Sequence, residues 1–134
     1  IQKVKTGKEI VVTSKNKVGA LSQVAKLFAD RGINIIAISA QAAGGVALMN
    51  FVVDEQTRAA DLLRKNKFQF TENNVVLIEL EDRPGALKQV TQMLAARKID
   101  LLNIYGSTAA TYAPCVLVLS SSDNQKAIVT LRKA

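Results

Sequence analysis

Few side chains in this sequence could carry out catalysis. The chain has no histidine, which removes the usual general base, the histidine-activated nucleophile and most zinc sites. Its one cysteine, Cys115, lies in an apolar stretch and is expected to be a small buried residue. The carboxylates of Glu79, Glu81 and Asp82 cluster at the end of a predicted strand, and we interpret them as a solvated strand edge. The sequence therefore predicts a protein that is not an enzyme and that holds no metal and no cofactor.

Two glycines are placed where they could serve binding. Gly19 and Gly85 each stand between a predicted strand and a predicted helix. Glycine lets the backbone approach a ligand closely, and the start of a helix presents unpaired N–H groups and a positive dipole end that suit a carboxylate. Each glycine could instead simply permit a tight turn. The residues alone leave both interpretations open.

Composition and charge narrow the class of protein. The chain has 134 residues, of which 49% are apolar, and 18 Lys and Arg against 11 Asp and Glu give a net charge of +7. The lysines are scattered, which favours a solvated surface over a nucleic-acid site. Apolar runs are shorter than the ~20 residues of a membrane helix, and no signal-peptide pattern opens the chain. We expect a cytoplasmic protein without membrane contact.

The sequence repeats itself. Val18-Gly19-Ala20-Leu21 aligns with Pro84-Gly85-Ala86-Leu87 at an offset of 66 residues, and we extend this alignment without a gap to the end of the chain. Such a match indicates duplication of one folding unit. The predicted units are residues 1–73, with an N-terminal extension, and residues 74–134. Units this small have marginal cores, so we expect them to pack together or to form a homodimer.

Each unit shows the same order of elements. The apolar periodicity predicts a strand, an amphipathic helix, two strands and a second helix, and the first unit adds a closing strand at residues 68–71. Thr57 and Asp123 are the predicted N-caps of the second helices, and Ala43-Gly44-Gly45 is a predicted hairpin turn. The fold class is α+β, with two ferredoxin-like βαββαβ units whose antiparallel sheets are covered by helices on one face.

The second unit lacks an obvious fourth strand. Ile1-Gln2-Lys3-Val4-Lys5 alternates apolar and polar residues and could supply it, from this chain or from a neighbour. Disorder or a shortened chain would explain the gap equally well.

These features together resemble the ACT domain family. The resemblance rests on Asn16-Lys17-Val18-Gly19-Ala20-Leu21 and Asp82-Arg83-Pro84-Gly85-Ala86-Leu87, each between a strand and a helix, and on Gly32-Ile33-Asn34-Ile35 and Lys98-Ile99-Asp100-Leu101 after that helix. The chain resembles small stand-alone tandem ACT proteins. The resemblance implies a regulatory module that binds an amino acid between two ACT units, whose sheets join side by side.

The resemblance also implies a set of ligand contacts. It places them at Ser14, Asn16 and Asn34 beside Gly19 and Ala20, and in the second repeat at Asp82, Gly85, Ala86 and Asp100, where Leu80 replaces the serine. An asparagine can serve both the carboxylate and the ammonium of an amino acid, whereas an ionised aspartate can only accept hydrogen bonds. We expect Asn34 to lie near the loop in the βαβ crossover. Asn16 and Asp82 could instead be helix caps.

The residues of the central strands argue against RNA recognition as a competing function. The same fold serves RNA recognition, but that function needs aromatic residues on the central strands, and residues 10–13 and 75–80 contain none. We therefore expect no specific nucleic-acid binding. The favoured function is that of a regulatory protein that binds an amino acid, as a homodimer and as partner of a regulated enzyme. The alternative is an interaction module that binds no ligand and regulates an enzyme or a transcription system.

Overall fold

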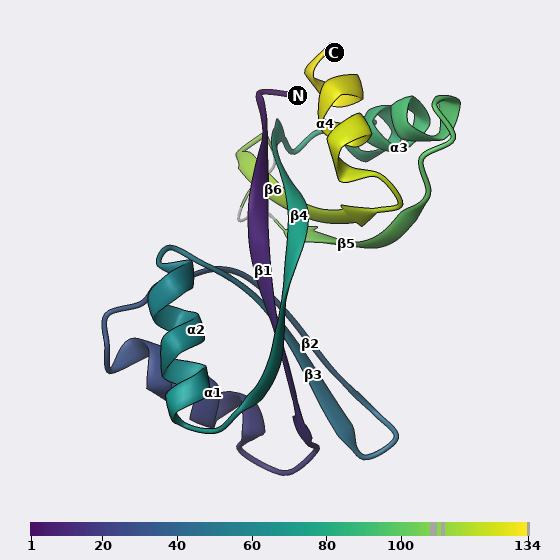
Figure 1. Cartoon of the computed structure of the whole chain (residues 1–134). Helices are drawn as coiled ribbons and strands as arrows, with labels where there is room; N and C mark the ends of the chain where they lie inside the picture. The colour runs from purple at the N-terminus through teal and green to yellow at the C-terminus, as the bar shows by residue number, and fades with distance from the viewer. Residues whose placement is uncertain (108–109, 111, 134) are drawn as a thin grey trace. The chain divides into compact units, whose positions relative to one another are not determined.

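The chain folds into two compact units. The computed structural model describes residues 1–107, 110 and 112–133. The first unit is Lys8–Asn73, and the second combines Asn74–Ala134 with Ile1–Gly7. Strands β1 (Lys3–Lys15) and β4 (Gln69–Glu81) each contribute residues to both units (Figure 1). The chain therefore passes from one unit to the other within strands and not through a linker.

The first unit has the predicted order of elements. Between β1 and β4 lie α1 (Ala20–Ala29), β2 (Ile35–Ala43), β3 (Val46–Val53) and α2 (Gln56–Lys65). Its strands pair in the order β2-β3-β1-β4, and both helices lie on one face of them (Figure 1). This arrangement confirms the predicted fold class.

The core of the first unit lies between these helices and the sheet. Val24 and Phe28 of α1 are fully buried, as the helical spacing predicts, against Ile10 and Val12 of β1. The rings of Phe28 and Phe51 meet edge to face with centroids 5.3 Å apart, a geometry that aromatic pairs prefer. Full burial of one such side chain stabilises the fold by about 1.5–3 kcal/mol.

The second unit is closed by the N-terminus of the chain. It contains α3 (Ala86–Ala96), β5 (Leu101–Ser107), β6 (Pro114–Ser121) and α4 (Asn124–Arg132), with strand order β1-β4-β6-β5. The N–H of Gln2 donates to the carbonyl of Glu79 at 2.8 Å, Arg132 Nε donates to the carbonyl of Val4 at 3.1 Å, and the Val4 side chain is buried in this core. Residues 1–7 thus pack with the second unit, in the place of its fourth strand, and not as an extension of the first.

The two repeats do not align without a gap. The N–H of Asn34 donates to Asp54 Oδ1 in the first unit, and the N–H of Asp100 donates to Ser122 Oγ in the second, both at 2.9 Å. Asn34 and Asp100 are 66 residues apart in the sequence, whereas Asp54 and Ser122 are 68 residues apart. The expected gapless register is therefore wrong beyond the hairpin, because the offset between equivalent residues grows by two between Asp100 and Ser122.

The predicted hairpin of the first unit is confirmed. Gly44 and Gly45 join β2 to β3 with φ of 56° and 82°, the left-handed values that a two-residue hairpin requires. The corresponding crossing, residues 108–112, was expected to be longer, and its residues 108, 109 and 111 lie outside the described part of the chain.

Local differences from the sequence prediction concern strand and helix ends. The strands predicted at residues 68–71 and 75–80 form one continuous β4, a neighbour of β1 in the sheet, although the residues between them are exposed and polar. The second helix of the first unit is capped by Glu55 and not by Thr57, which lies inside the helix. Asp123 is confirmed as an N-cap, because its Oδ1 accepts from the N–H of Lys126 at 3.0 Å.

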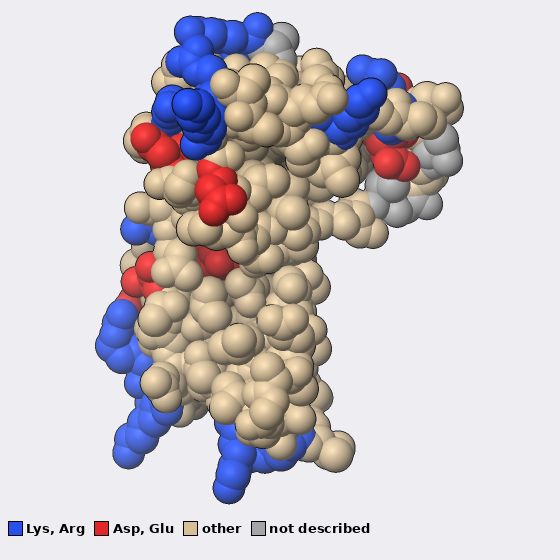
Figure 2. Space-filling view, turned by 90° about the vertical axis from the view of Figure 1, so that its right-hand side faces the viewer, with Lys and Arg blue, Asp and Glu red and all other residues tan. Residues whose placement is uncertain are grey.

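The distribution of charge follows the scattered lysines. Figure 2 shows one face, on which Lys and Arg side chains stand in several separate groups with Asp and Glu nearby. Among the described residues, no helix has the length and apolar character needed to cross a membrane.

Candidate functional site

A cavity of about 390 Å³ lies at the strand-to-helix loop of the first unit. Binding sites for small molecules commonly have volumes of ~300–1,000 Å³. The cavity lining comes from the loop, the first turn of α1, the end of β2 and the start of β3: Asn16, Lys17, Gly19, Ala20, Leu21, Ser22, Ala40, Gln41, Ala42, Ala47 and Met49. Three predicted site residues, Asn16, Gly19 and Ala20, are therefore together at one cavity.

Gly19 shapes the start of α1. It is the N-cap residue, with φ of 88°, and no side chain caps the helix. The N–H of Ala20 donates to the carbonyl of Lys17 at 3.2 Å and that of Gln23 to Gly19 at 3.0 Å. The N–H groups of Leu21 and Ser22 have no partner among the described residues. Two free donors at the positive end of a helix thus belong to residues that line the cavity.

The cavity has a polar rim and an apolar floor. Lys17 is its one charged lining residue, and Asn16 and Ser22 add polar side chains. Gln41 alternates with Ala40 and Ala42 along β2 and pairs with Leu48, so its side chain lies on the other face of the sheet and its backbone lines the cavity. The floor is made of small apolar residues and one methionine: Ala40, Ala42, Ala47 and Met49. Sequence reasoning missed Gln41. The hairpin turn was its signal, because the N–H of Asn16 donates to the carbonyl of Gly45 at 2.8 Å and so holds the end of β2 near the loop.

Ser14 lies beside the cavity without lining it. Ser14 of β1 stands opposite Ala47 of β3, on the face that carries the cavity floor. Its Oγ donates to the carbonyl of Lys15 at 3.2 Å. Ser14 can therefore affect the cavity only through the position of its neighbours.

Asn34 is at the opposite end of the sheet, contrary to our expectation. The loop follows Lys15, which pairs with Val46 at the start of β3. Asn34 precedes Ile35, which pairs with Val53 at the end of β3. Parallel strands joined by a crossover helix start at the same edge, so the start of β2 is level with Lys8, where the first unit's part of β1 begins, and not with the loop that follows Lys15.

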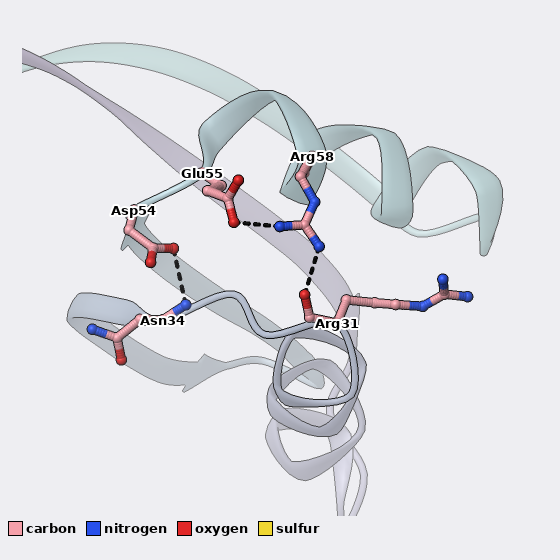
Figure 3. A network of polar contacts seen from close by, with 5 residues as sticks. All are labelled: Arg31, Asn34, Asp54, Glu55 and Arg58. Atoms are coloured by element: carbon pink, nitrogen blue, oxygen red, sulfur yellow. Dashed lines mark hydrogen bonds and ion pairs between the residues drawn. The ribbon is translucent and has the colours of Figure 1, made fainter.

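The surroundings of Asn34 form a different polar network. Figure 3 shows its N–H donating to Asp54 while its side chain points away from that carboxylate. In the same network Arg58 pairs with Glu55 and donates to the carbonyl of Arg31. Asp54 holds the chain between α1 and β2 in place, which gives Asn34 a backbone role within the first unit.

The second loop has the same backbone form with other contacts. Gly85 caps α3 with φ of 91° and no side-chain cap, so neither Asn16 nor Asp82 is the cap of its helix. The carbonyl of Asp82 accepts from the N–H of Tyr112 at 2.7 Å. Ala86 lines a cavity of about 160 Å³ together with Ile1, Gln2, Leu80, Glu81, Arg83 and Gln89. Asp100, the counterpart of Asn34, again follows the first helix of its unit and is held through Ser122.

In the second unit, bulkier residues stand at the positions that correspond to Ser14 and to the floor residue Ala47. Leu80 and Cys115 are paired across β4 and β6 and are both buried, where the first unit has Ser14 and Ala47. Burial raises the pKa of the Cys115 thiol, and the negative charge of Asp82 raises it further. Cys115 is therefore a protonated thiol at neutral pH, with no thiolate available for nucleophilic attack or metal binding.

The other candidate reactive residues form no site. Glu79 and Glu81 alternate with Leu80 along β4, so their carboxylates lie on the face opposite the helices. Among the described residues no group of His, Cys, Asp and Glu could hold a metal ion.

Family models match both repeats. The AHAS small subunit-like ACT domain matches residues 10–67, and the ACT domain matches residues 74–134. The chain belongs to the ACT domain family. It is a tandem ACT protein, as the resemblance implies. No protein with a curated description matches it in sequence.

Two solved structures are similar to this chain over nearly its whole length. Protein BT0572 from Bacteroides thetaiotaomicron is similar with a TM-score of 0.89 and 25% identity, over 97% of this chain and 89% of that one. The ligand-free regulatory subunit of aspartate kinase from Thermus thermophilus has a TM-score of 0.68 at 15% identity, over 98% of this chain and 95% of that one. At this identity the second likeness shows the fold alone.

Proposed function

We propose that this tandem ACT chain is a non-enzymatic regulatory protein that binds an amino acid in the cavity of its first unit. The observation that carries the proposal is the pair of free N–H groups, at Leu21 and Ser22, at the edge of a cavity of about 390 Å³. The likeness to regulatory subunits of aspartate kinase supports a regulatory role.

The groups around the cavity match the two charges of an amino acid. The carboxylate accepts from the N–H groups of Leu21 and Ser22, where the helix dipole and the charge of Lys17 both favour an anion. The ammonium donates to the amide oxygen of Asn16. The ligand side chain then lies over the alanines of the floor.

The second loop is less suited to a carboxylate. Asp82 stands where the first loop has Asn16, and an ionised carboxylate repels another. Asp82 can serve an ammonium, with Gly85 and Ala86 forming the turn. We therefore place the principal site in the first unit and give Asp82 a secondary role. Asp100, like Asn34, lies at the far end of its unit from the loop.

Participation of Asn34 requires a homodimer. Asn34 lies at the far end of its own unit, so its side chain would reach the cavity only from a second copy of the chain. Ile36 and Ile38 on the edge strand β2 are 51% and 44% exposed, which gives such a copy an apolar surface to cover. Light scattering at micromolar concentration tests this part, because a monomer would contradict it.

A pure interaction module is the second candidate. Val18 is fully exposed and Leu21 is partly exposed, both beside the cavity. Exposed apolar groups of this kind suit contact with a regulated enzyme. On this alternative the cavity stays empty when the partner binds.

A thermal-shift panel of the twenty amino acids tests the proposal. A ligand at 100 times its dissociation constant stabilises the fold by ~2.7 kcal/mol. For an amino acid that shifts the melting temperature, Asn16→Ala should weaken binding several-fold, since it removes a hydrogen bond of ~0.5–1.5 kcal/mol. The matched control Asn73→Ala removes an exposed amide outside the cavity and should bind as the parent does. No shift with any amino acid would favour the interaction module.

A further inference from the structure

A second cavity in the first unit is lined mainly by cationic side chains. It has a volume of about 250 Å³ and is lined by Arg31, Arg58, Asp61, Leu62 and Lys65. Arg31 follows the end of α1, and the other four residues follow the i, i+3, i+4, i+7 spacing of one face of α2. This cavity shares no lining residue with the cavity at Gly19.

The charges around this cavity are unbalanced. Asp61 is paired with Arg64 at 3.1 Å, so the one acidic lining residue is already partly neutralised. Arg58 is held in place by Glu55 and by the carbonyl of Arg31 (Figure 3). The side chains of Arg31 and Lys65 have no ion pair among the described residues, and Figure 3 shows the Arg31 guanidinium extending away from the network. Two free cations and one fixed guanidinium therefore surround a concave surface.

The second unit repeats the same three positive charges. Arg97 corresponds to Arg31, because their N–H groups donate to equivalent carbonyls of the preceding helix. The N-caps of α2 and α4 are Glu55 and Asp123, so Lys126 and Lys133 take the places of Arg58 and Lys65. By contrast, the counterpart of Ser14 in the second unit is Leu80, and that of Asn16 is Asp82. The three positive charges are therefore present in both repeats, whereas the polar residues Ser14 and Asn16 near the first loop are not repeated in the second unit.

Helix stability does not explain all of these charges. Lys65 and Lys133 follow or end their helices, where a cation is favourable. Arg58 and Lys126 occupy the third helical position after the N-cap, where a cation opposes the dipole. Glu55 offsets this cost for Arg58, and the two unpaired cations that line the same cavity, Arg31 and Lys65, favour an anion there.

We propose that the cavity of Arg31, Arg58 and Lys65 binds a phosphoryl group of a small molecule. The two unpaired cations, Arg31 and Lys65, match a doubly charged anion, and the guanidinium of Arg31 can donate paired hydrogen bonds to phosphate oxygens. The volume suits a phosphoryl group with the adjoining part of its ester, which the Leu62 side chain would contact. This binding is independent of the amino acid site.

Calorimetric titration of the full chain with inorganic pyrophosphate, at fixed ionic strength, tests the proposal. Saturable binding is expected, and the double variant Arg31→Gln, Lys65→Gln should weaken it at least about tenfold because it removes both free cations. The control Lys8→Gln removes one exposed charge of the first unit outside the cavity and should change affinity less than twofold. Circular dichroism checks that each variant is folded.

Three results would overturn the proposal. The first is the absence of binding. The second is binding that Lys8→Gln weakens as much as the double variant does, since this would reflect net charge alone. The third is binding of a poly-glutamate peptide without binding of pyrophosphate, which would make this cavity a docking surface for an acidic protein segment. A loss of amino acid binding leaves these outcomes unchanged, so the two proposals fail separately.

Discussion

The N–H of Asn16 donates to the carbonyl of Gly45 at 2.8 Å. This hydrogen bond joins the loop before α1 to the turn between β2 and β3. The loop and these two strands supply most of the residues that line the cavity. The cavity is therefore held by backbone contacts before any ligand binds, which lowers the ordering cost of binding.

Replacement of Gly19 should damage both fold and site. An added Cβ would contact nothing within 4 Å, but the φ of 88° strains any residue other than glycine. We expect Gly19→Val to lower the free energy of unfolding by about 1–3 kcal/mol, and Gly19→Asn to lower it less, because asparagine tolerates this region better. Urea denaturation measures both. Equal losses in the two variants would show that strain at this φ is not the cause.

The turns after α1 and α3 provide a matched pair of substitutions. Gly32 and Lys98 both have left-handed backbone, with φ of 68° and 58°. Lys98→Gly should raise the free energy of unfolding by about 0.5–1 kcal/mol, and Gly32→Ala should lower it by a similar amount. Thermal and urea unfolding of the two variants will show opposite signs if backbone strain governs these turns.

Cys115 should make stability depend on pH in the alkaline range. Because burial raises the pKa of its thiol in the folded state, the stabilising contribution is complete below the unfolded pKa of ~8.5 and is lost as pH rises towards the folded pKa. The unfolded thiol has a pKa of ~8.5. The parent should therefore lose more stability than Cys115→Ala as the pH rises from about 8 to about 10. Parallel pH profiles for the two proteins would contradict this.

Removal of residues 1–7 should destabilise the second unit selectively. The deletion exposes the edge of β4 and removes the buried Val4 side chain. Hydrogen exchange should show faster exchange in β4, β6 and α4, while the N–H groups of α1 and β3 stay protected. Uniformly faster exchange in both units would contradict a local role for this segment.

The sequence was sufficient for the fold because both repeats carry the same periodic signals. One local pattern is the helical spacing of Val24 and Phe28, and another is the pair of strand runs on either side of Gly19. Packing did not override either of them. The N-terminal alternation around Val4 indicated a strand but not its location, because pairing with β4 depends on contacts distant in sequence.

The site was predicted only where it is local. Asn16, Gly19 and Ala20 are neighbours in sequence and lie together. Asn34 was misplaced because its position depends on the direction of β2, and Gln41 was missed because only the hairpin register brings it to the loop.

In the proposed function, the N–H groups of Leu21 and Ser22 bind the carboxylate of an amino acid. The most direct measurement follows backbone amide shifts by nuclear magnetic resonance during titration with the amino acid that gives the largest thermal shift, and with its carboxamide derivative. Downfield proton shifts are expected at Leu21 and Ser22 with the amino acid, and much smaller shifts at the same concentration of the carboxamide, whose uncharged oxygen is a weaker acceptor. Shifts confined to Leu87 and Lys88 of the second loop, or equal shifts with both compounds, would contradict it.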